Sequence, residues 1–360
     1  MWDFWRRHKR KLFVTLGVVG GGYAFYKLYN VYKQRLGELE KELVREKEHE
    51  ELIKAQMQEH FMTIQRIADS TTLPHTMKYL SRRVAQDLDL SLLTERLQQG
   101  KGQPNSLTSS EKLELWNMLK ILSFTRVVLS LWSMTILSLY VRVQVNILGR
   151  HLYIDTARGL ESSHLLEEGN FIDTEDEQKF LASVDYLASS GLPSLVYKMQ
   201  AAATDCLKSK QLRDVFDASI LHDTIVEILD TFISMGKPYH WVEYLMPGDA
   251  STSSGDEGDV SRFQRLMAET RAVLSSAEFR NVVDVSLKAV VDALVKDMAD
   301  QAGGGNALSG IPLVKLLPRI AQMGTVLLSE PTENRFIQII TNVQDVELFF
   351  TLLYANSPPL

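Results

Sequence analysis

The stretch VVLSLWSMTILSLYV, residues 127–141, carries no charged side chain and limits the folds that are open to this chain. Arg126 and Arg142 bound it, and its fifteen residues are fewer than the ~20 that a membrane-spanning helix needs. A helix that is apolar on every side must be covered on every side by other parts of the protein. We therefore predict that it forms the central helix of a helical bundle.

Helical periodicity recurs along most of the chain, and strand-like alternation and internal repeats do not. The helices expected on this pattern cover 76–99, 109–124, 126–150, 174–190, 193–210, 213–236, 259–276, 278–300, 313–328 and 332–355. Stretches with Gly, Pro and Ser separate them, and the acidic stretch at 248–259 reads as a disordered loop. The predicted fold class is all-α: a single elongated helical bundle over 71–360 with an N-terminal membrane-anchor helix.

Residues 1–32 combine a basic start, MWDFWRRHKRK, with an uncharged apolar run at 12–26. Tryptophans and tyrosines flank the run, as they do at membrane interfaces. The side chains expected to face lipid are Leu12, Phe13, Val14, Leu16, Val18, Val19, Tyr23 and Phe25. We predict a membrane anchor, with a signal peptide and an interfacial or soluble helix as the alternatives.

The orientation of this anchor is ambiguous from the sequence. The basic cluster at 6–11 would keep the N-terminus in the cytosol under the positive-inside rule. The rest of the chain would then have to cross the membrane. The rule describes insertion by the translocon, and another route of insertion need not obey it.

Residues 33–70 are rich in Glu, Lys, Arg and Gln, with opposite charges three and four residues apart. This pattern predicts a charged, solvent-exposed helical stalk that merges into the bundle. A coiled coil is the alternative, but sustained heptads are missing.

Composition and motifs argue against catalysis, a metal site and nucleic-acid binding. The formal net charge is −6, and the one cysteine cannot form an internal disulfide. The eight histidines are scattered without the spacing of paired metal ligands. Phosphate-binding loops and nucleophile motifs are also missing from the sequence. We therefore expect a protein that is not an enzyme and that needs no cofactor.

The segment KLELWNMLKILSFTR, residues 112–126, places a tryptophan between two lysines on one helical face. On a helical wheel the expected core face comprises Leu115, Met118 and Leu122. Trp116 lies about 100° from its centre, between Lys112 and Lys120. Two interpretations stay open. Trp116 either covers the core from its rim, or it is a binding hot spot for an amphipathic helix whose carboxylates meet the two lysines.

At this point the sequence resembles a known family, the peroxisomal biogenesis factor 3 family (the third peroxin), and within it a plant-like member. The segments that carry the resemblance are WDFWRRHKRKLFVTLGVVGGGY, KLELWNMLKILSFTR, VRVQVNILGRHLYID, YLMP, ETRAVLSSAEF and PLVKLLP. They run from the N-terminus to residue 318, with little likeness over 156–240.

The resemblance implies a peroxisomal membrane protein with a lumenal N-terminus and a cytosolic body, which would settle the orientation of the anchor. It implies a docking receptor for peroxin nineteen, the soluble chaperone that carries new peroxisomal membrane proteins. The body would bind the N-terminal amphipathic helix of that chaperone. The family's docking tryptophan corresponds to Trp116, its neighbouring lysine to Lys112 and the next leucine to Leu119. Leu97 and Asn146 match further groove positions.

Two functions are therefore compared. The first is a docking receptor that brings cargo-loaded chaperone to the peroxisomal membrane, and so meets peroxin nineteen, membrane lipid and, indirectly, cargo. The alternative is an organelle tether that links the peroxisome to cytoskeletal or autophagy machinery through the acidic loop at 248–259 or another surface. Passage of the protein through the endoplasmic reticulum is compatible with either function.

Overall fold

The computed structural model describes residues 55–99, 108–161, 174–236, 239–248, 261–300 and 310–355, together with 41, 44, 45, 47, 51 and 52. The chain divides into two compact units, Met1–His60 and Phe61–Leu360. The described residues of the first unit are all helical. The predicted anchor at 12–26 and most of the predicted acidic loop at 248–259 lie outside the described residues.

The second unit is built almost wholly of helices. Its α-helices are α2 (Leu73–Asp87), α3 (Ser91–Gln99), α4 (Ser109–Glu161), α5 (Thr174–Ala182), α6 (Leu192–Leu207), α7 (Ala218–Ser234), α8 (Val242–Leu245), α9 (Arg262–Leu274), α10 (Ala277–Asp300), α11 (Leu313–Leu327), α12 (Arg335–Thr341) and α13 (Gln344–Ala355). Three further turns are η1 (Ala68–Thr72), η2 (Ser183–Asp185) and η3 (Leu187–Gly191), and residues 61–67 are helical as well.

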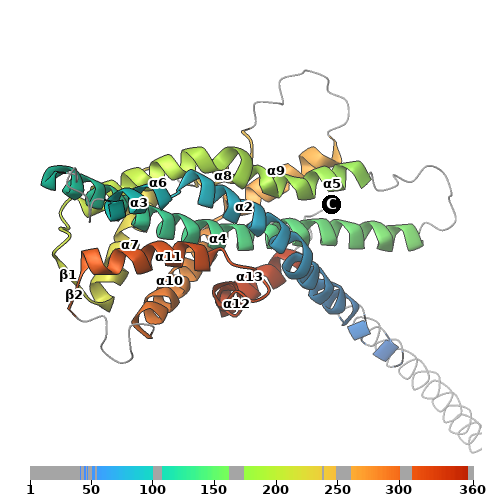
Figure 1. Cartoon of the computed structure of the whole chain (residues 1–360). Coiled ribbons are helices and arrows are strands. Elements are labelled where there is room, and N and C mark those ends of the chain that lie inside the picture. The colour runs from blue at the N-terminus through green and yellow to red at the C-terminus, as the bar shows by residue number, and fades with distance from the viewer. Residues whose placement is uncertain are drawn as a thin grey trace, which may run out of the picture. The chain divides into compact units, whose positions relative to one another are not determined.

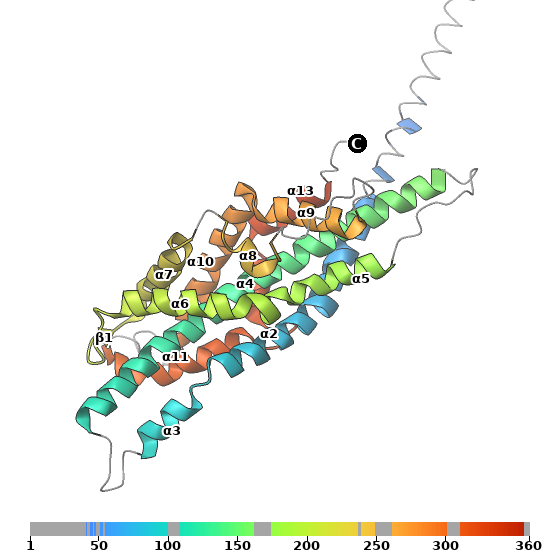
Figure 2. The ribbon, with the colours of Figure 1, turned by 90° about the horizontal axis from the view of Figure 1, so that it is seen from above.

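The long helix α4 forms the centre of this unit. Every residue from Val127 to Arg150 is buried, which includes the whole uncharged stretch of the sequence. Helices α6 and α11 pack along it, and α2, α3, α5, α7, α9, α10, α12 and α13 contact it as well. Figures 1 and 2 show α4 running through the unit with the other helices around it. The predicted central helix, covered on all sides, is confirmed.

Two hydroxyl side chains inside the uncharged stretch of this helix bond to the helix itself. Thr135 donates to the carbonyl oxygen of Leu131 over 2.9 Å, and Ser138 donates to that of Met134 over 2.8 Å. Such bonds to the preceding turn satisfy a hydroxyl where water does not reach. Thr135 and Ser138 are satisfied in this way, whereas the buried hydroxyls of Ser130 and Ser133 have no hydrogen-bond partner among the described residues.

Among the described residues, Ser109–Ile154 is long and apolar enough to cross a membrane, and α12 with α13 would qualify only as one bent pair. The most apolar window of Ser109–Ile154 is 83% buried inside the protein. Its apolar character is therefore explained by the core, and the anchor at 12–26 stays a prediction.

The all-α class is confirmed, although several predicted elements differ. The helix expected at 76–99 is divided into α2 and α3, and the one expected at 332–355 is divided into α12 and α13. Among the described residues the strands are β1 (Val215–Phe216) and β2 (Ile311–Pro312), an antiparallel pair in which Val215 faces Pro312. The helices expected at 109–124 and 126–150 are one helix, so the break expected at residue 125 was wrong. Its Thr125 hydroxyl donates to the carbonyl oxygen of Ile121 over 2.8 Å, within the continuous helix.

Candidate functional site

A capping box fixes the first turn of α4 and so sets the position of Trp116. Thr108 donates through both its backbone N–H and its hydroxyl to Glu111 Oε2, each over 2.7 Å. The N–H of Glu111 donates back to the Thr108 hydroxyl over 3.3 Å. The Thr108 hydroxyl and N–H hold the pKa of the Glu111 carboxyl below its usual value. The sequence TSSE thus starts the helix two turns before the tryptophan.

A small leucine cluster, separate from the main core, lies where α3 covers the start of α4. It consists of Leu90, Leu97, Leu115 and Leu119, all at most 9% exposed. Leu93, Trp116, Leu122 and Ala321 pack against it and are partly buried. Two residues expected at the docking site, Leu97 and Leu119, are thus brought together as buried support.

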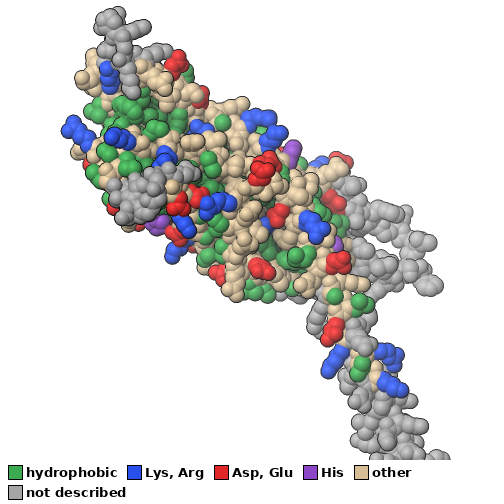
Figure 3. All heavy atoms as spheres, turned by 60° about the horizontal axis from the view of Figure 1, so that its bottom comes forward, with side chains coloured by type: hydrophobic (Ala, Val, Ile, Leu, Met, Phe, Trp, Pro, Cys, Tyr) green, Lys and Arg blue, Asp and Glu red, His purple; other side chains and the backbone are tan. Residues whose placement is uncertain are grey.

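Trp116 lies between this leucine cluster and the main core, and packs against both while staying partly exposed. Leu113 lies about 60° from Trp116 around the helix, and it is 56% exposed. Figure 3 shows hydrophobic side chains gathered at the end of the unit where α3, α4 and α11 meet. Trp116 is therefore partly buried against the core, and its neighbour Leu113 is an exposed apolar side chain.

The core face predicted for this part of α4 was partly wrong. Met118, expected on this face, is 45% exposed, whereas Leu119, expected at its edge, and Ser123 are buried. The buried side is therefore rotated toward Trp116. The wheel could not show this because two helices from distant parts of the sequence, α6 and α11, decide which side of α4 is covered.

Lys120 does not take the surface position that the sequence predicted. It is 5% exposed, and its ammonium group donates to the carbonyl oxygens of Leu207 over 3.0 Å and Lys210 over 2.6 Å. Burial lowers the pKa of this ammonium group. Lys120 thus ties α4 to the end of α6, and its charge does not face a partner.

Lys112 differs from Lys120 in that it is only partly buried. It lies one helical turn before Trp116 on the same side of α4. Of the two lysines expected to meet carboxylates, Lys112 is the one whose position suits that role.

Asn146 does not lie near Trp116. The two residues are 30 positions apart in one continuous helix, which corresponds to about 45 Å. Asn146 is fully buried, donates to the carbonyl oxygen of Arg142 over 2.6 Å and accepts from Gln65 over 3.0 Å. It cannot share one docking surface with Trp116, and its bonds join α4 to the helical residues 61–67.

Sequence reasoning missed Leu113 and Leu90, whereas Leu115 was already expected on the core face of α4 and is buried there. One feature of the sequence could have indicated Leu113. It lies next to Lys112 and away from the face of α4 on which the other leucines gather. Metal binding offers no further candidate, because the described residues contain no group of three or more potential ligands.

The chain is similar to known proteins over nearly its whole length. A family model described as Peroxin-3 matches residues 103–356. Peroxisome biogenesis protein 3-2 of Arabidopsis thaliana is 54% identical, over 99% of this chain and 98% of that relative. Peroxisome biogenesis protein 3-1 of the same plant is also 54% identical, over 98% of each chain. Peroxisomal biogenesis factor 3 of Bos taurus is 30% identical, over 99% of this chain and 97% of its own.

Proposed function

Because this chain belongs to the Peroxin-3 family and so acts in peroxisome biogenesis, we propose that it is the membrane docking receptor for peroxin nineteen. In this role it is not an enzyme. It binds the N-terminal amphipathic helix of the cargo-loaded chaperone, and the cargo is then inserted into the peroxisomal membrane.

The family resemblance seen in the sequence is confirmed, including its plant-like character. Identity is 54% to the two Arabidopsis proteins and 30% to the bovine one. The family is peroxisomal, and the relatives are named as biogenesis proteins or factors.

The observation that carries the proposal is the position of Trp116. It packs on two apolar clusters and still has exposed surface, with Leu113 beside it. Binding hot spots are enriched in tryptophans of this kind, because a rigid, well-supported ring loses little entropy when a partner covers it. An amphipathic helix can place an apolar side chain on Trp116 and a second on Leu113.

The positive charge of Lys112 is a second argument for docking at the Trp116 surface. Lys112 is partly exposed on the Trp116 side of α4 and is positioned to attract an acidic group on the docking helix. Such a rim charge mainly raises the association rate and fixes the register of the helix. Leu97 and Leu119 act beneath the surface, where they hold α3 and α4 together.

In this proposal the segment 12–26 anchors the protein in the peroxisomal membrane, with the N-terminus in the lumen and the second unit in the cytosol. The anchor keeps the docking surface at the membrane, so that chaperone captured there releases its cargo next to lipid. Entry through the endoplasmic reticulum is compatible with this arrangement.

Calorimetric titration with the partner's N-terminal helix tests the proposal. Trp116→Ala should weaken binding by about 2 kcal/mol or more, roughly 30-fold. Leu113→Ala should weaken it by about 1 kcal/mol without a stability cost, because that side chain is exposed. Tyr197→Ala removes an aromatic ring that is 76% exposed on α6 and serves as the matched control. Unchanged affinity in both docking variants would rule this surface out.

A cellular measurement separates docking from tethering. A tagged chain with Trp116→Ala should still reach peroxisomes, while a peroxisomal membrane reporter fails to insert. An organelle tether acting through the acidic loop predicts the reverse: deletion of 248–259 would harm function more than Trp116→Ala does.

A further inference from the structure

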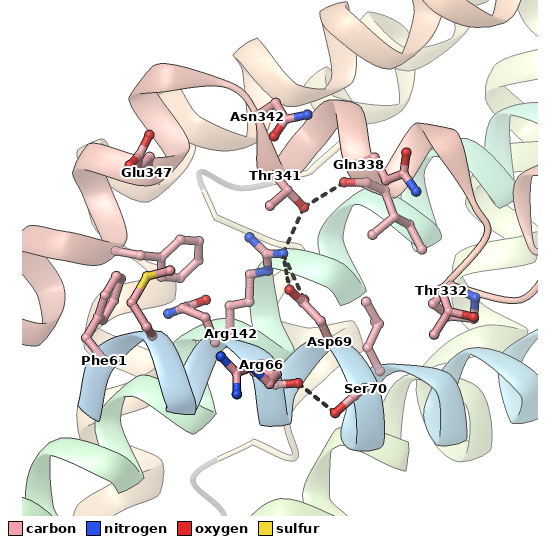
Figure 4. Close-up of a pocket in the computed structure, with 16 residues that line it drawn as sticks. Phe61, Arg66, Asp69, Ser70, Arg142, Thr332, Gln338, Thr341, Asn342 and Glu347 are labelled. Atoms are coloured by element: carbon pink, nitrogen blue, oxygen red, sulfur yellow. Dashed lines mark hydrogen bonds and ion pairs between the residues drawn. The ribbon is translucent and has the colours of Figure 1, made fainter. Parts of the chain in front are cut away.

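A cavity of about 800 Å³ lies in the second unit, away from the Trp116 surface. Its walls come from the helical residues 61–73, from α12 and from α13, and Arg142 of α4 lies at its centre (Figure 4). Since 26 residues of one helix separate Trp116 from Arg142, the cavity is about 39 Å from the docking surface. It therefore forms a separate site.

Arg142 is 5% exposed and uses only one end of its guanidinium group within the protein. Its Nη2 donates to Asp69 Oδ1 over 2.8 Å, to Asp69 Oδ2 over 3.0 Å and to the Thr341 hydroxyl over 2.8 Å. Within the described residues, neither its Nη1 nor its buried Nε makes a hydrogen bond to the protein. A buried cation with an unused donor edge in a cavity is suited to a ligand that accepts hydrogen bonds.

A second arginine lines the same cavity. Arg66 is exposed, lines the cavity and forms no ion pair among the described residues. Figure 4 shows Arg66 and Arg142 among the side chains that line the cavity, with Glu347 on another part of its wall. Asp69 offsets part of the positive charge, but its carboxylate is already engaged by Nη2 and is 42% exposed. The cavity is thus lined by two arginines, and Asp69 neutralises only part of their positive charge.

The backbone at this point departs from regular helix. Asp69 and Ser70 belong to η1, a π-helical turn between the helical residues 61–67 and α2. Such turns are rare and occur often at functional sites. Here the turn places the acid that orients Arg142 on the cavity wall.

Apolar and polar side chains share the rest of the wall, and the apolar ones contribute more of its accessible surface. The apolar lining residues are Phe61, Met62, Leu73, Pro331, Ile337 and Phe350. Leu73, Ile337 and Phe350 are at most 5% exposed and give fixed surfaces, whereas Met62 is 56% exposed at the opening. An apolar wall around a cationic centre matches a molecule with one acidic group and a hydrocarbon chain.

We propose that this cavity binds one long-chain carboxylate, a free fatty acid. Its carboxylate accepts hydrogen bonds from Arg142 Nη1 and from Arg66, and its chain lies along the apolar wall. The volume is in the range of about 300–1,000 Å³ that is typical of small-molecule sites. A single acyl chain suits this volume better than a two-chain lipid or a helix.

Photolabelling of the full chain in nanodiscs of neutral phospholipid tests the site. The probe is palmitate that carries a diazirine in its chain, and peptides are mapped by mass spectrometry. The expected result is saturable labelling of peptides from 61–73 and 331–350. Palmitate should compete with this labelling, and palmityl alcohol, which lacks the negative charge, should not.

Three variants and a control sharpen the test. Ser70→Trp puts a large ring on an exposed wall position and should lower cavity labelling about tenfold or more. Arg66→Gln should lower it about threefold, and Arg142→Gln about tenfold, because charge-assisted bonds are lost. Arg82→Gln removes an exposed arginine of α2 outside the cavity and should change nothing. Thermal unfolding shows whether Arg142→Gln still folds. If it does not, the variants at the exposed positions Ser70 and Arg66 test the proposal.

Several outcomes would overturn the proposal. One is that palmitate does not compete with the labelling. Another is that palmityl alcohol competes as well as palmitate does. The third is that neither Ser70→Trp nor Arg66→Gln changes the labelling. Competition by an amphipathic peptide or by phosphatidylserine, but not by palmitate, would assign the cavity to a different occupant.

Discussion

Replacing Lys120 with alanine should destabilise the fold and leave the docking surface in place. The Lys120 ammonium group donates to the carbonyl oxygen of Leu207, the last residue of α6, and to that of Lys210 in the turn that follows. The carbonyl of Leu207 keeps a second donor, the N–H of Lys210, over 3.2 Å. Within the described residues, the carbonyl of Lys210 has no other donor. Lys120→Ala therefore costs two charge-assisted bonds and leaves one carbonyl unpaired.

The size of the loss follows from opposing contributions. Hydrogen bonds to a charged group contribute about 1.5–3 kcal/mol each, and an unpaired buried group costs about 1–3 kcal/mol. Removing the lysine also removes the cost of keeping a charge away from water, the same burial that lowers its pKa. We expect a net loss of about 2–3 kcal/mol for Lys120→Ala. Lys120→Met keeps the aliphatic stem and should lose about 1–2 kcal/mol.

Stability should also depend on pH through this group. Because the pKa of Lys120 is lowered from 10.5 in the folded state, the unfolded chain binds more protons just below pH 10.5. The contribution of Lys120 to the free energy of unfolding therefore rises with pH in that range, and Lys120→Met should lack this rise.

Urea unfolding of the full chain in a neutral detergent, followed by far-ultraviolet circular dichroism, measures these losses. Lys112→Ala is the matched control, since its side chain is only partly buried and its loss should stay within about 0.5 kcal/mol. The reasoning fails if Lys120→Ala unfolds like the wild type and weakens partner-helix binding as strongly as Trp116→Ala does. Lys120 would then face the partner, as the helical wheel suggested.

Four further substitutions test the packing, one helix cap and the pH dependence of stability. In Gly191→Ala the new Cβ would lie 2.2 Å from the carbonyl oxygen of Tyr244, so the melting temperature should fall by the equivalent of about 1–3 kcal/mol. Gly248→Ala, with nothing within 4 Å of its Cβ, should leave it unchanged. Asn334→Ala removes the side chain that accepts from the first turn of α12, and the urea midpoint should drop by about 1–2 kcal/mol in free energy. Burial raises the pKa of Tyr140 to about 12, so its contribution is present below pH 10.0 and lost as the pH rises through 12. Tyr140→Phe should therefore lose less stability than the wild type in urea unfolding over that range.

The sequence was sufficient to predict the fold class because one local pattern demanded it. The stretch 127–141 has no side that tolerates water, and only a surrounding layer can cover it. The helical periodicity of the flanking segments supplies that layer. Boundaries were harder to predict: separate helices were expected at 109–124 and 126–150, but Arg126 donates across to Thr325 of α11 over 2.9 Å and stays in one continuous helix.

The candidate site could be predicted only where residues close together in the sequence determine the position of a side chain. The capping box and the spacing of Lys112 and Trp116 are local, and both are visible in the sequence. The role of Lys120 depends on carbonyl groups 87 and 90 residues away, which no local pattern shows. Asn146 came from the family resemblance, and a match to a groove position does not say which of several surfaces contains it.

The cavity is the extreme case of this limit, because its walls come from segments nearly 290 residues apart in the chain. It also shows what the length of α4 achieves. The helix is buried on every side between Val127 and Arg150, so it cannot bend without disrupting the packing around it. A rigid helix that carries Trp116 near one end and Arg142 about 39 Å away keeps the two surfaces apart. In the two proposals made above, the docked helix and the fatty acid therefore bind about 39 Å apart and do not compete for the same surface.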